Sequence, residues 1–415
     1  MIIALILASS LWQTSVQIDS ISLKQCYTLA RQSQPIRKQL ALNRKATKLS
    51  RVSINRKNYP QLSMSGNATY QNEVTSIPGA PFTISKDQYK LSLEVDQNLF
   101  DAETARKARK VNRAQGILNE AQTNVQLYSV HNEVNQAFFG VLLARTNKRV
   151  LELKKQVLVK RLAMIRSRVQ NGMALPGARA ALQAELLSTE QQITSVEADQ
   201  EASLKTLSKI IGRLVNKGTT LRLPADTAGF IAMHQIDRPE LKMYAANQQL
   251  LNRKMQQTKV TNLPRLSAFF QGMYGRPGLN IFKDQFEPNY MVGVHLRWNI
   301  WDWGVAKRRR SQLAVQKGIV RTQKQSFLRN VQIGIQRDIT DISKYHRLLG
   351  KDRRIIELRK QVERQSASQL RNGTITPSNY LDDLNAVYQA QLSREQHHLQ
   401  WIFAIIQYKT KTGTL

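Results

Sequence analysis

The sequence predicts an α+β membrane protein that contains two copies of a strand-strand-helix-helix unit. Three observations predict this fold class: an internal repeat, strand-like runs in which apolar and polar residues alternate, and long helical runs without proline. Only 41% of the 415 residues are hydrophobic, which is a low fraction for a chain with large globular cores. An elongated protein is therefore expected.

The internal repeat keeps nearly one register along the chain. An offset of 201 residues relates three landmarks of the first half to the second: Leu99-Phe100-Asp101 to Ile300-Trp301-Asp302, Asn171-Gly172 with Pro176 to Asn372-Gly373 with Pro377, and Gly212 to Gly413. Upstream, an offset of 204 residues relates Pro35 and Pro60 to Pro239 and Pro264. Landmarks that agree in order and in spacing indicate a duplication.

The duplication divides the chain into four expected segments. Residues 1–17, an apolar run with small residues behind it and no basic residue before it, are expected to be a signal peptide with a truncated start. The first repeat is expected over 18–214, with strands at about 60–100 and helices at about 104–171 and 176–212. A linker over 215–236 leads to the second repeat over 237–415, with strands at about 264–303 and helices at about 305–371 and 377–412.

The strand-like runs alternate with a period of two residues. Their apolar positions are predicted to face lipid, and they are Leu91, Leu93 and Val95 in the first half and Val292, Val294, Leu296 and Trp298 in the second. Strands of roughly ten residues with one apolar and one charged face fit a bacterial outer-membrane barrel. A half-buried sheet of a soluble protein alternates in the same way and stays open as an alternative.

Membrane spanning by helices is not expected, because no stretch approaches 18 consecutive apolar residues. Four strands cannot close a barrel, and open sheet edges in lipid would leave backbone groups unpaired. Several chains must therefore complete the cylinder, and three copies would give twelve strands.

The helical runs carry apolar residues at spacings of three and four, which is typical of a seam that packs against another helix. The first run, from Thr104 to Asn171, contains no proline. A proline at the start of each returning run suits the first turn of a helix. Asp101 and Asp302 are expected to cap the starts of the two long helices, where a carboxylate meets free amide groups.

The charge is strongly positive, with 62 Lys and Arg against 29 Asp and Glu and a net charge of +33. Acidic partners are therefore plausible, and a basic coiled coil that binds nucleic acid or has a structural role is the alternative function. Aromatic residues do not interleave with the basic helical run, and a nucleic-acid binder needs neither a leader nor apolar strand faces. No nucleic-acid partner is expected.

Catalytic chemistry is not expected. The single cysteine, Cys26, excludes an intramolecular disulfide and a Cys-based zinc cluster. His397 and His398 are adjacent and point to different helix faces, so they cannot chelate one ion together. The sequence contains no Gly-rich phosphate loop, nucleophile elbow or zinc-protease motif. A non-enzyme without catalytic residues, metal ligands or cofactors is predicted.

Taken in order, these landmarks resemble the TolC family of outer-membrane efflux and secretion channels. The resemblance rests on duplicated halves, on Leu-Phe-Asp at the start of the long helix and on Asn-Gly-x-x-x-Pro at its far turn, and it covers about residues 18–415. It implies a homotrimer with a shared 12-stranded β-barrel, continued by a helical coiled-coil tunnel in the periplasm. It also implies the outer membrane as location, outer-membrane lipid as surroundings, and partnership with a periplasmic adaptor and a proton-driven or ATP-driven inner-membrane pump. The chain would be the passive exit duct of a tripartite efflux or type I secretion system.

The resemblance further implies that the helix turns form the periplasmic entrance and dock the adaptor. The residues that correspond are Asn171, Gly172, Pro176, Gly177, Arg179, Asn372, Gly373, Pro377, Asn379, Leu381, Asp382 and Asp383. Relatives carry an acidic ring six residues after the glycine, where this chain has Ala178 and Asn379. Leu381 and Leu384 fit both an adaptor-facing pattern and ordinary helix packing. The positive charge either lines the tunnel, which would favour anionic cargo, or faces outward toward peptidoglycan or lipid phosphates.

Overall fold

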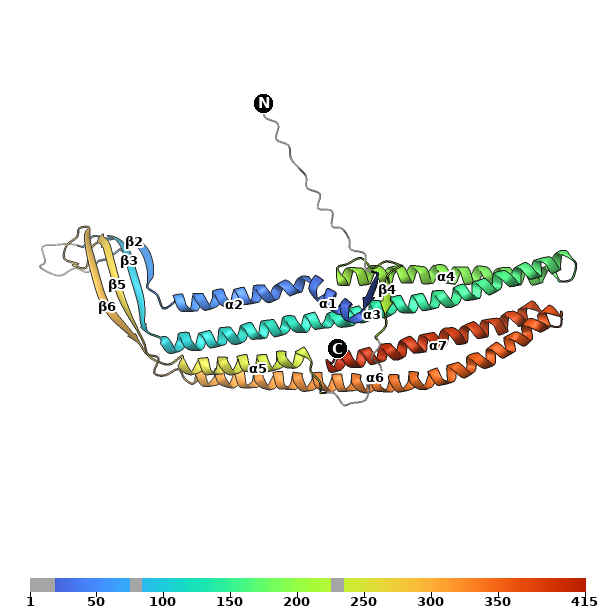
Figure 1. The fold of residues 1–415 in the computed structure, drawn as a ribbon. Coiled ribbons are helices and arrows are strands. Elements are labelled where there is room, and N and C mark those ends of the chain that lie inside the picture. The colour runs from blue at the N-terminus through green and yellow to red at the C-terminus, as the bar shows by residue number, and fades with distance from the viewer. Residues whose placement is uncertain (1–18, 75–83, 225–234) are drawn as a thin grey trace, which may run out of the picture. The chain divides into compact units, whose positions relative to one another are not determined.

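The computed structural model describes residues 19–74, 84–224 and 235–415, and it divides into two compact units (Figure 1). Unit 1 consists of the described parts of Met1–Arg37, Asn124–Pro239 and Ser326–Leu415. Unit 2 consists of those of Lys38–Thr123 and Glu240–Gln325. Two long helices, α3 (Ala102–Gln170) and α6 (Val305–Arg371), contribute residues to both units. The predicted signal peptide lies outside the described residues.

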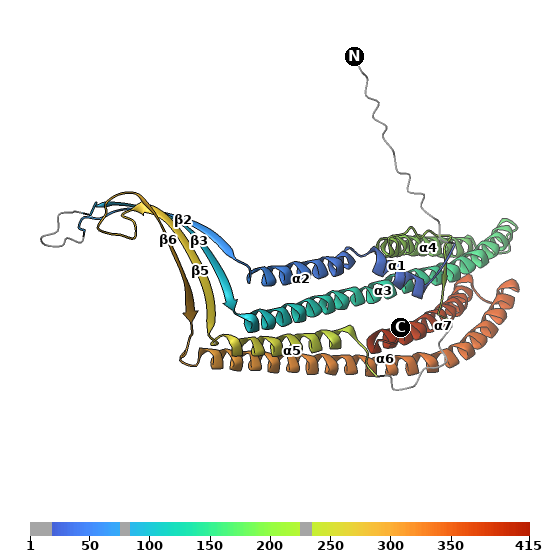
Figure 2. The same cartoon turned by 60° about the vertical axis from the view of Figure 1, so that its left-hand side comes forward.

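Unit 2 contains an antiparallel sheet that joins the two halves of the chain. Its strands are β2 (Gln61–Tyr70), β3 (Asp87–Phe100), β5 (Arg265–Arg276) and β6 (Glu287–Arg297), in the order β2-β3-β5-β6. Each half supplies one hairpin, and β3 pairs with β5 where the hairpins meet. Figures 1 and 2 both show the strands side by side as a curved sheet.

The register of the sheet puts most of the apolar residues of the four strands on one face. Val95 pairs with Leu62 on one side and with Phe270 on the other, and Phe270 pairs with Val292. Because directly paired residues project from the same face of an antiparallel sheet, these side chains form one row across it. The next row, with Glu94 beside Gln271, is polar and lies on the opposite face.

The last strand is shorter than the alternating sequence indicates. The pattern continues to Ile300, but β6 ends at Arg297, which pairs with Arg265 at the start of β5. Beyond this pair β6 has no neighbouring strand to bond to. The alternation records which residues face outward, whereas the length of the strand depends on its partner.

Helices pack in pairs next to the sheet in unit 2. Helix α2 (Lys38–Arg56) lies along the first part of α3, and α5 (Pro239–Gln257), followed by the 3₁₀ turn η2 (Thr258–Val260), lies along α6. Gly116 allows α2 to approach closely, because a Cβ there would lie 2.6 Å from Thr47 Oγ1. Asn112 Nδ2 donates to Thr47 O at 2.9 Å in the same contact. The helices α3 and α5 share a small apolar cluster of Ala114, Leu118, Ala246 and Leu250.

Unit 1 holds the largest apolar core. It is built from α1 (Leu23–Ser33), α4 (Pro176–Ile211), α7 (Pro377–Thr412) and the adjoining part of α3. The 3₁₀ turn η1 (Pro35–Arg37) follows α1, and none of its residues is buried. Phe138 and Leu207 are fully buried at its centre. Cys26 is buried beside them, and burial raises the pKa of its thiol to about 12. A short parallel pair, β1 (Ser20–Ser22) with β4 (Thr220–Arg222), covers this core and was not expected from the sequence.

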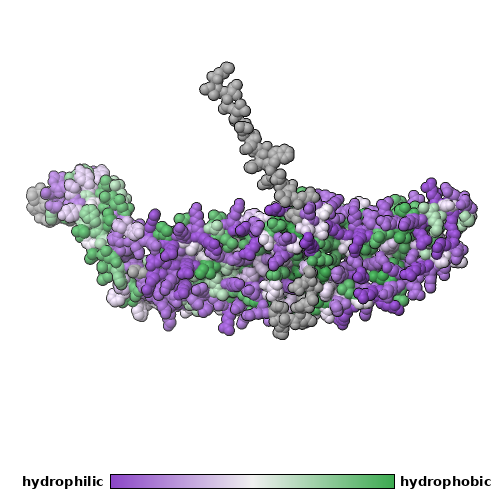
Figure 3. Space-filling view, viewed as in Figure 1, coloured by the Kyte–Doolittle hydropathy of each residue, from purple (hydrophilic) through white to green (hydrophobic). Residues whose placement is uncertain are grey.

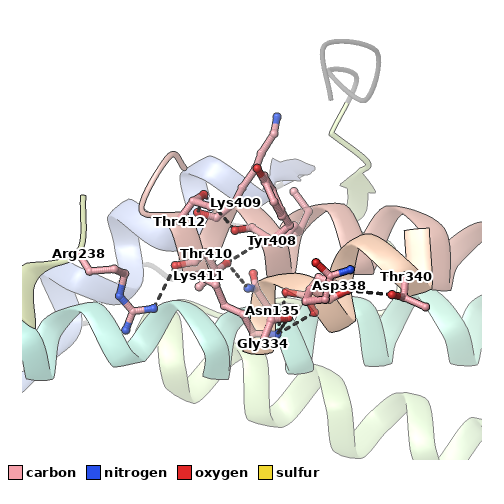
Figure 4. Close-up of polar contacts among 12 residues, drawn as sticks. Asn135, Arg238, Gly334, Asp338, Thr340, Tyr408, Lys409, Thr410, Lys411 and Thr412 are labelled. Atoms are coloured by element: carbon pink, nitrogen blue, oxygen red, sulfur yellow. Dashed lines mark hydrogen bonds and ion pairs between the residues drawn. The ribbon is translucent and has the colours of Figure 1, made fainter. Parts of the chain in front are cut away.

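Polar contacts fix the end of α7 to its neighbours in unit 1 (Figure 4). The backbone oxygen of Thr410 accepts from Tyr128 Oη at 2.7 Å and from Arg238 Nη1 at 3.2 Å. One residue further, Lys411 Nζ lies 2.7 Å from both carboxylate oxygens of Asp338 on α6. Burial raises the pKa of Asp338, although Lys411 acts in the opposite direction. The contact with Lys411 therefore stabilises the charged form of Asp338 at a buried position that disfavours this form.

We expect Lys411→Met to lower the free energy of unfolding by about 3 kcal/mol, because it leaves the buried Asp338 carboxylate without its cation. The penalty should shrink as the pH falls through the raised pKa of Asp338, since the protonated acid needs no partner. Chemical unfolding followed by circular dichroism measures both effects.

The double variant Asp338→Leu with Lys411→Met is the control, because it removes both charges. It should recover most of the stability. A double variant as unstable as Lys411→Met would show that packing, and not the unpaired charge, causes the loss.

Candidate functional site

The first helix turn of unit 1 is a glycine-terminated connection between α3 and α4. Gly172 has φ +71°, a left-handed conformation that favours glycine. Its N–H donates to Val169 O at 3.1 Å, and the N–H of Met173 donates to Arg168 O at 2.8 Å. These two bonds form a Schellman motif, which satisfies carbonyl groups at the helix end. Pro176 then starts α4.

The second turn, between α6 and α7, repeats this geometry. Gly373 has φ +75°, and its N–H donates to Leu370 O at 3.2 Å. The N–H of Thr374 donates to Gln369 O at 3.0 Å, which completes the second Schellman motif. Thr376 caps α7 by accepting from the N–H of Asn379 at 3.3 Å. Both turns are thus equivalent in backbone but not in side chains.

The side chain of one arginine connects the two turns by hydrogen bonds. Arg168, in the last turn of α3, donates from Nη1 to Leu370 O at 3.0 Å and from Nη2 to Arg371 O. Its guanidinium therefore lies on the C-terminal carbonyl groups of α6, where positive charge is stabilised by the helix dipole. We refer to this contact as the Arg168 link.

A buried tyrosine lies behind the Arg168 link. Tyr380 Oη accepts from Arg161 Nε at 3.1 Å and donates to Glu363 Oε1 at 3.1 Å. The Arg161 guanidinium lies 5.1 Å from the centre of the Tyr380 ring. Tyr380 is fully buried, and burial raises the pKa of its hydroxyl. This contact brings α3, α6 and α7 together.

The sequence carries little signal for either contact. Arg161 and Arg168 stand among many basic residues of the same helical run. Their partners in the second half become visible only when the two turns lie side by side. Sequence reasoning missed both residues for this reason.

Most of the residues predicted at the entrance lie exposed on the two turns. The exposed ones are Asn171, Gly172, Pro176, Gly177, Arg179, Asn372, Gly373, Asn379 and Asp382. Pro377 and Asp383 are half-buried, and Asp383 accepts a hydrogen bond from the Ser366 hydroxyl. Leu381 is only 7% exposed and packs with Leu384, Leu158 and Leu182 inside unit 1. Helix packing accounts for Leu381, so we leave it out of the docking surface proposed below.

The apolar face of the sheet is exposed in unit 2. Val292 is 70% exposed, Val294 64% and Leu296 68%, and Trp298 directly after β6 is also exposed. Leu91 and Leu93 are exposed on β3, whereas Val95 is half-buried. Figure 3 shows hydrophobic residues gathered on the sheet and hydrophilic residues over the adjoining helices of unit 2. An apolar surface of this kind is typical of a site that contacts a membrane or another protein.

The two aspartates at the helix starts make different contacts. Asp302 accepts from Asn262 Nδ2 at 2.9 Å and from the N–H groups of Ala306 and Gly304, both at 2.9 Å. The bond from Asn262, followed by those from the two backbone N–H groups, lowers the pKa of Asp302. The carboxylate of Asp101 instead lies 3.9 Å from Arg265 Nε, and its backbone oxygen accepts from Ala105 N at 3.2 Å.

Two further findings concern residues 19–74, 84–224 and 235–415. None of the helices in these ranges combines the length and the apolar character needed to cross a membrane. Within the same ranges, His, Cys, Asp and Glu side chains form no group of three or more that could hold a metal ion.

Comparison with known proteins relates part of the sequence to one family and the fold to several solved structures. The profile of the family described as outer membrane efflux protein matches residues 27–213. The first repeat of the chain therefore matches the outer membrane efflux protein family. No curated protein sequence matches the chain.

Solved structures match through both halves of the chain. The outer membrane protein VceC from Vibrio cholerae is 13% identical, with a TM-score of 0.71, and the match covers 94% of this chain and 96% of that one. The CmeC outer membrane channel of Campylobacter jejuni is 14% identical, with a TM-score of 0.71 and coverage of 94% and 85%. The open state of the MtrE outer membrane channel of Neisseria gonorrhoeae is 14% identical, with a TM-score of 0.69 and coverage of 94% and 88%.

The comparisons confirm the predicted fold class of the single chain and the family resemblance. The matched family is described as outer membrane efflux proteins, and CmeC and MtrE are described as outer membrane channels. The first repeat thus resembles outer membrane efflux proteins, and the fold of the chain is that of these outer-membrane channels.

Gly172→Ala should destabilise the first turn by roughly 1 kcal/mol, because alanine disfavours a positive φ. Gly177→Ala is the matched control, since Gly177 is the second residue of α4 and a Cβ there meets nothing within 4 Å. The control should leave the turn unchanged or stabilise α4. Amide hydrogen exchange at residues 168–175 distinguishes them, and equal exchange in both variants would contradict the requirement for glycine.

Proposed function

We propose that the chain is the outer-membrane channel component of a tripartite efflux or type I secretion system. It gives substrates a passive exit duct, and an inner-membrane pump drives them through a periplasmic adaptor. The observation that carries this proposal is the exposed apolar face of the sheet, since it matches a lipid-facing wall in a chain whose helical hairpins end in exposed turns.

The assembly we propose is a homotrimer. The sheet ends on β2 at one edge and on β6 at the other, and these edges in lipid require partners. Joining β2 of one protomer to β6 of the next closes a barrel, and three copies supply twelve strands. In this barrel Leu91, Leu93, Val95, Val292, Val294, Leu296 and Trp298 face lipid.

The face assignment is tested with two neighbouring residues of β6. Val294→Arg puts a charge on the apolar face, at a cost of about 2–4 kcal/mol near the bilayer midplane. His295→Arg is the matched control, because His295 lies on the opposite face beside Phe269. We expect Val294→Arg to reduce the yield of detergent-extracted trimer and of channels in planar bilayers, and His295→Arg to leave both near the unchanged protein.

Two results would contradict the proposal in different ways. Equal losses in both variants would mean that the assignment of the two faces is wrong. A stable monomer that is soluble without detergent would contradict the proposed barrel.

The helix turns are the proposed periplasmic entrance and docking surface for the adaptor. The exposed residues around Asn171-Gly172, Arg179 and Asn372-Gly373 are available to a partner, together with Asp382. Relatives place an acidic ring near this point, whereas this chain has Ala178 and Asn379. We infer that the Arg168 link keeps the entrance closed at rest in place of that ring.

Arg168→Gln should therefore open the entrance. Charge-assisted hydrogen bonds contribute about 1.5–3 kcal/mol each, so their loss should shift the closed-to-open equilibrium about tenfold or more. Arg166→Gln is the control, because Arg166 is exposed on the same helix turn. Single-channel conductance should rise for Arg168→Gln alone. A rise of equal size in the control would attribute the effect to general charge.

A further inference from the structure

The helices next to the sheet carry more than half of the net positive charge of the chain. Residues 38–56, 102–123, 239–257 and 305–325 together contain 21 Lys and Arg but only three Asp and Glu. These residues belong almost entirely to unit 2 and supply more than half of the net charge of +33. We call the basic residues within 102–113 of α3 and 305–310 of α6, with those of α2 that line the groove between α2 and α3, the basic collar.

The duplicated chain repeats the collar in both halves. Arg106, Lys107 and Arg109 correspond to Lys307, Arg308 and Arg310 at the repeat offset of 201 residues. Positive charge near a helix start is disfavoured by the helix dipole, and the first turn of α6 contains no acidic residue to offset it. Within the described part of the chain, the side chains of residues 307–310 have no acidic partner. These cations are therefore available to bind anions from outside the chain.

A groove between α2 and α3 concentrates the collar further. It has a volume of about 560 Å³, and its wall includes Lys48, Arg51, Lys110 and Arg113. None of these four side chains makes an ion pair with a described residue. Their neighbour Arg44 is neutralised by Glu120, with Nε 3.1 Å from Oε1. The groove thus presents several unpaired cations with space for a ligand between them.

The aromatic residues beside the collar indicate what that ligand is. Trp301 and Trp303 lie between β6 and α6 and are 70% and 80% exposed, and Tyr59 before β2 is also exposed. Exposed Trp and Tyr at strand ends are typical of the membrane–water interface. With a rise of 1.5 Å per residue, Lys307 to Arg310 lie within roughly 3–8 Å of the start of α6. The head-group layer extends about 5–8 Å beyond the hydrocarbon on each side, so these cations lie at the level of lipid phosphates.

We propose that the basic collar binds the phosphate groups of anionic lipids in the periplasmic leaflet of the outer membrane, and that the α2–α3 groove holds one such head group. The inference rests on the proposed function, because it requires the sheet to lie in lipid. It assigns this part of the positive charge to the outer surface and not to the tunnel.

The test measures lipid retained by the full-length protein in detergent, by native mass spectrometry. Phosphatidylglycerol is the anionic probe, phosphatidylcholine the zwitterionic one, and inorganic phosphate the soluble one. One variant combines Lys110→Gln with Arg113→Gln, and a second combines Arg308→Gln with Arg309→Gln. The control combines Lys360→Gln with Arg364→Gln, exposed residues of α6 in unit 1 that remove the same charge.

We expect the unchanged protein to retain phosphatidylglycerol in preference to phosphatidylcholine. Each collar variant should weaken this binding roughly fivefold per basic residue removed, whereas the control should bind as before. Inorganic phosphate at the same concentration should not displace the lipid.

Several results would overturn the inference. Equal retention of the two lipids would contradict the proposed lipid-binding site. Equal losses in the collar variants and the control would contradict it as well. Displacement by inorganic phosphate would show a site for free phosphate. Loss of anion selectivity in bilayer recordings of the collar variants would place the charge in the tunnel. Trimer yield and conductance are measured in the same samples, so a conducting trimer without lipid preference refutes the collar and leaves the channel standing.

Discussion

The pairing of β3 with β5 is the interaction on which the architecture depends. It is the contact through which the hairpin of the first half and the hairpin of the second become one sheet, and its register sets which residues share a face. Val95 opposite Phe270 puts the apolar rows of both halves on the same side. A shift of one residue would turn one hairpin over and mix apolar with charged residues on each face. The exposed apolar face of the sheet therefore depends on this one ladder.

The helix turns and the strands are the parts of the fold that the sequence predicts best. Gly172 and Gly373 stand where the helices end with positive φ, and Pro176 and Pro377 stand where the next helices begin. Such positions tolerate few other residues, so a duplicated chain repeats them and the repeat becomes visible. The alternating strand residues are equally direct, because they have to match the pleat of the sheet.

Contacts between distant elements were not readable in the same way. Arg168 resembles every other basic residue of its helix until Leu370 and Arg371 of the second half lie beside it. Leu381 has the spacing of a docking residue and of a core residue alike, and only its burial decides between them. The β1–β4 pair is too short to leave a pattern in three residues on each side. Each of these features depends on a partner that lies far away in sequence.

The burial of Cys26 has a practical consequence for labelling this protein. Its thiol is enclosed in the core of unit 1 with a pKa of about 12, so almost no thiolate is present at neutral pH. It is also the single cysteine of the chain. A cysteine introduced at an exposed turn position such as Asn171 would then be the one group that maleimide reagents modify. Spin labels, fluorophores and crosslinkers can be attached to the native sequence without first removing a competing thiol.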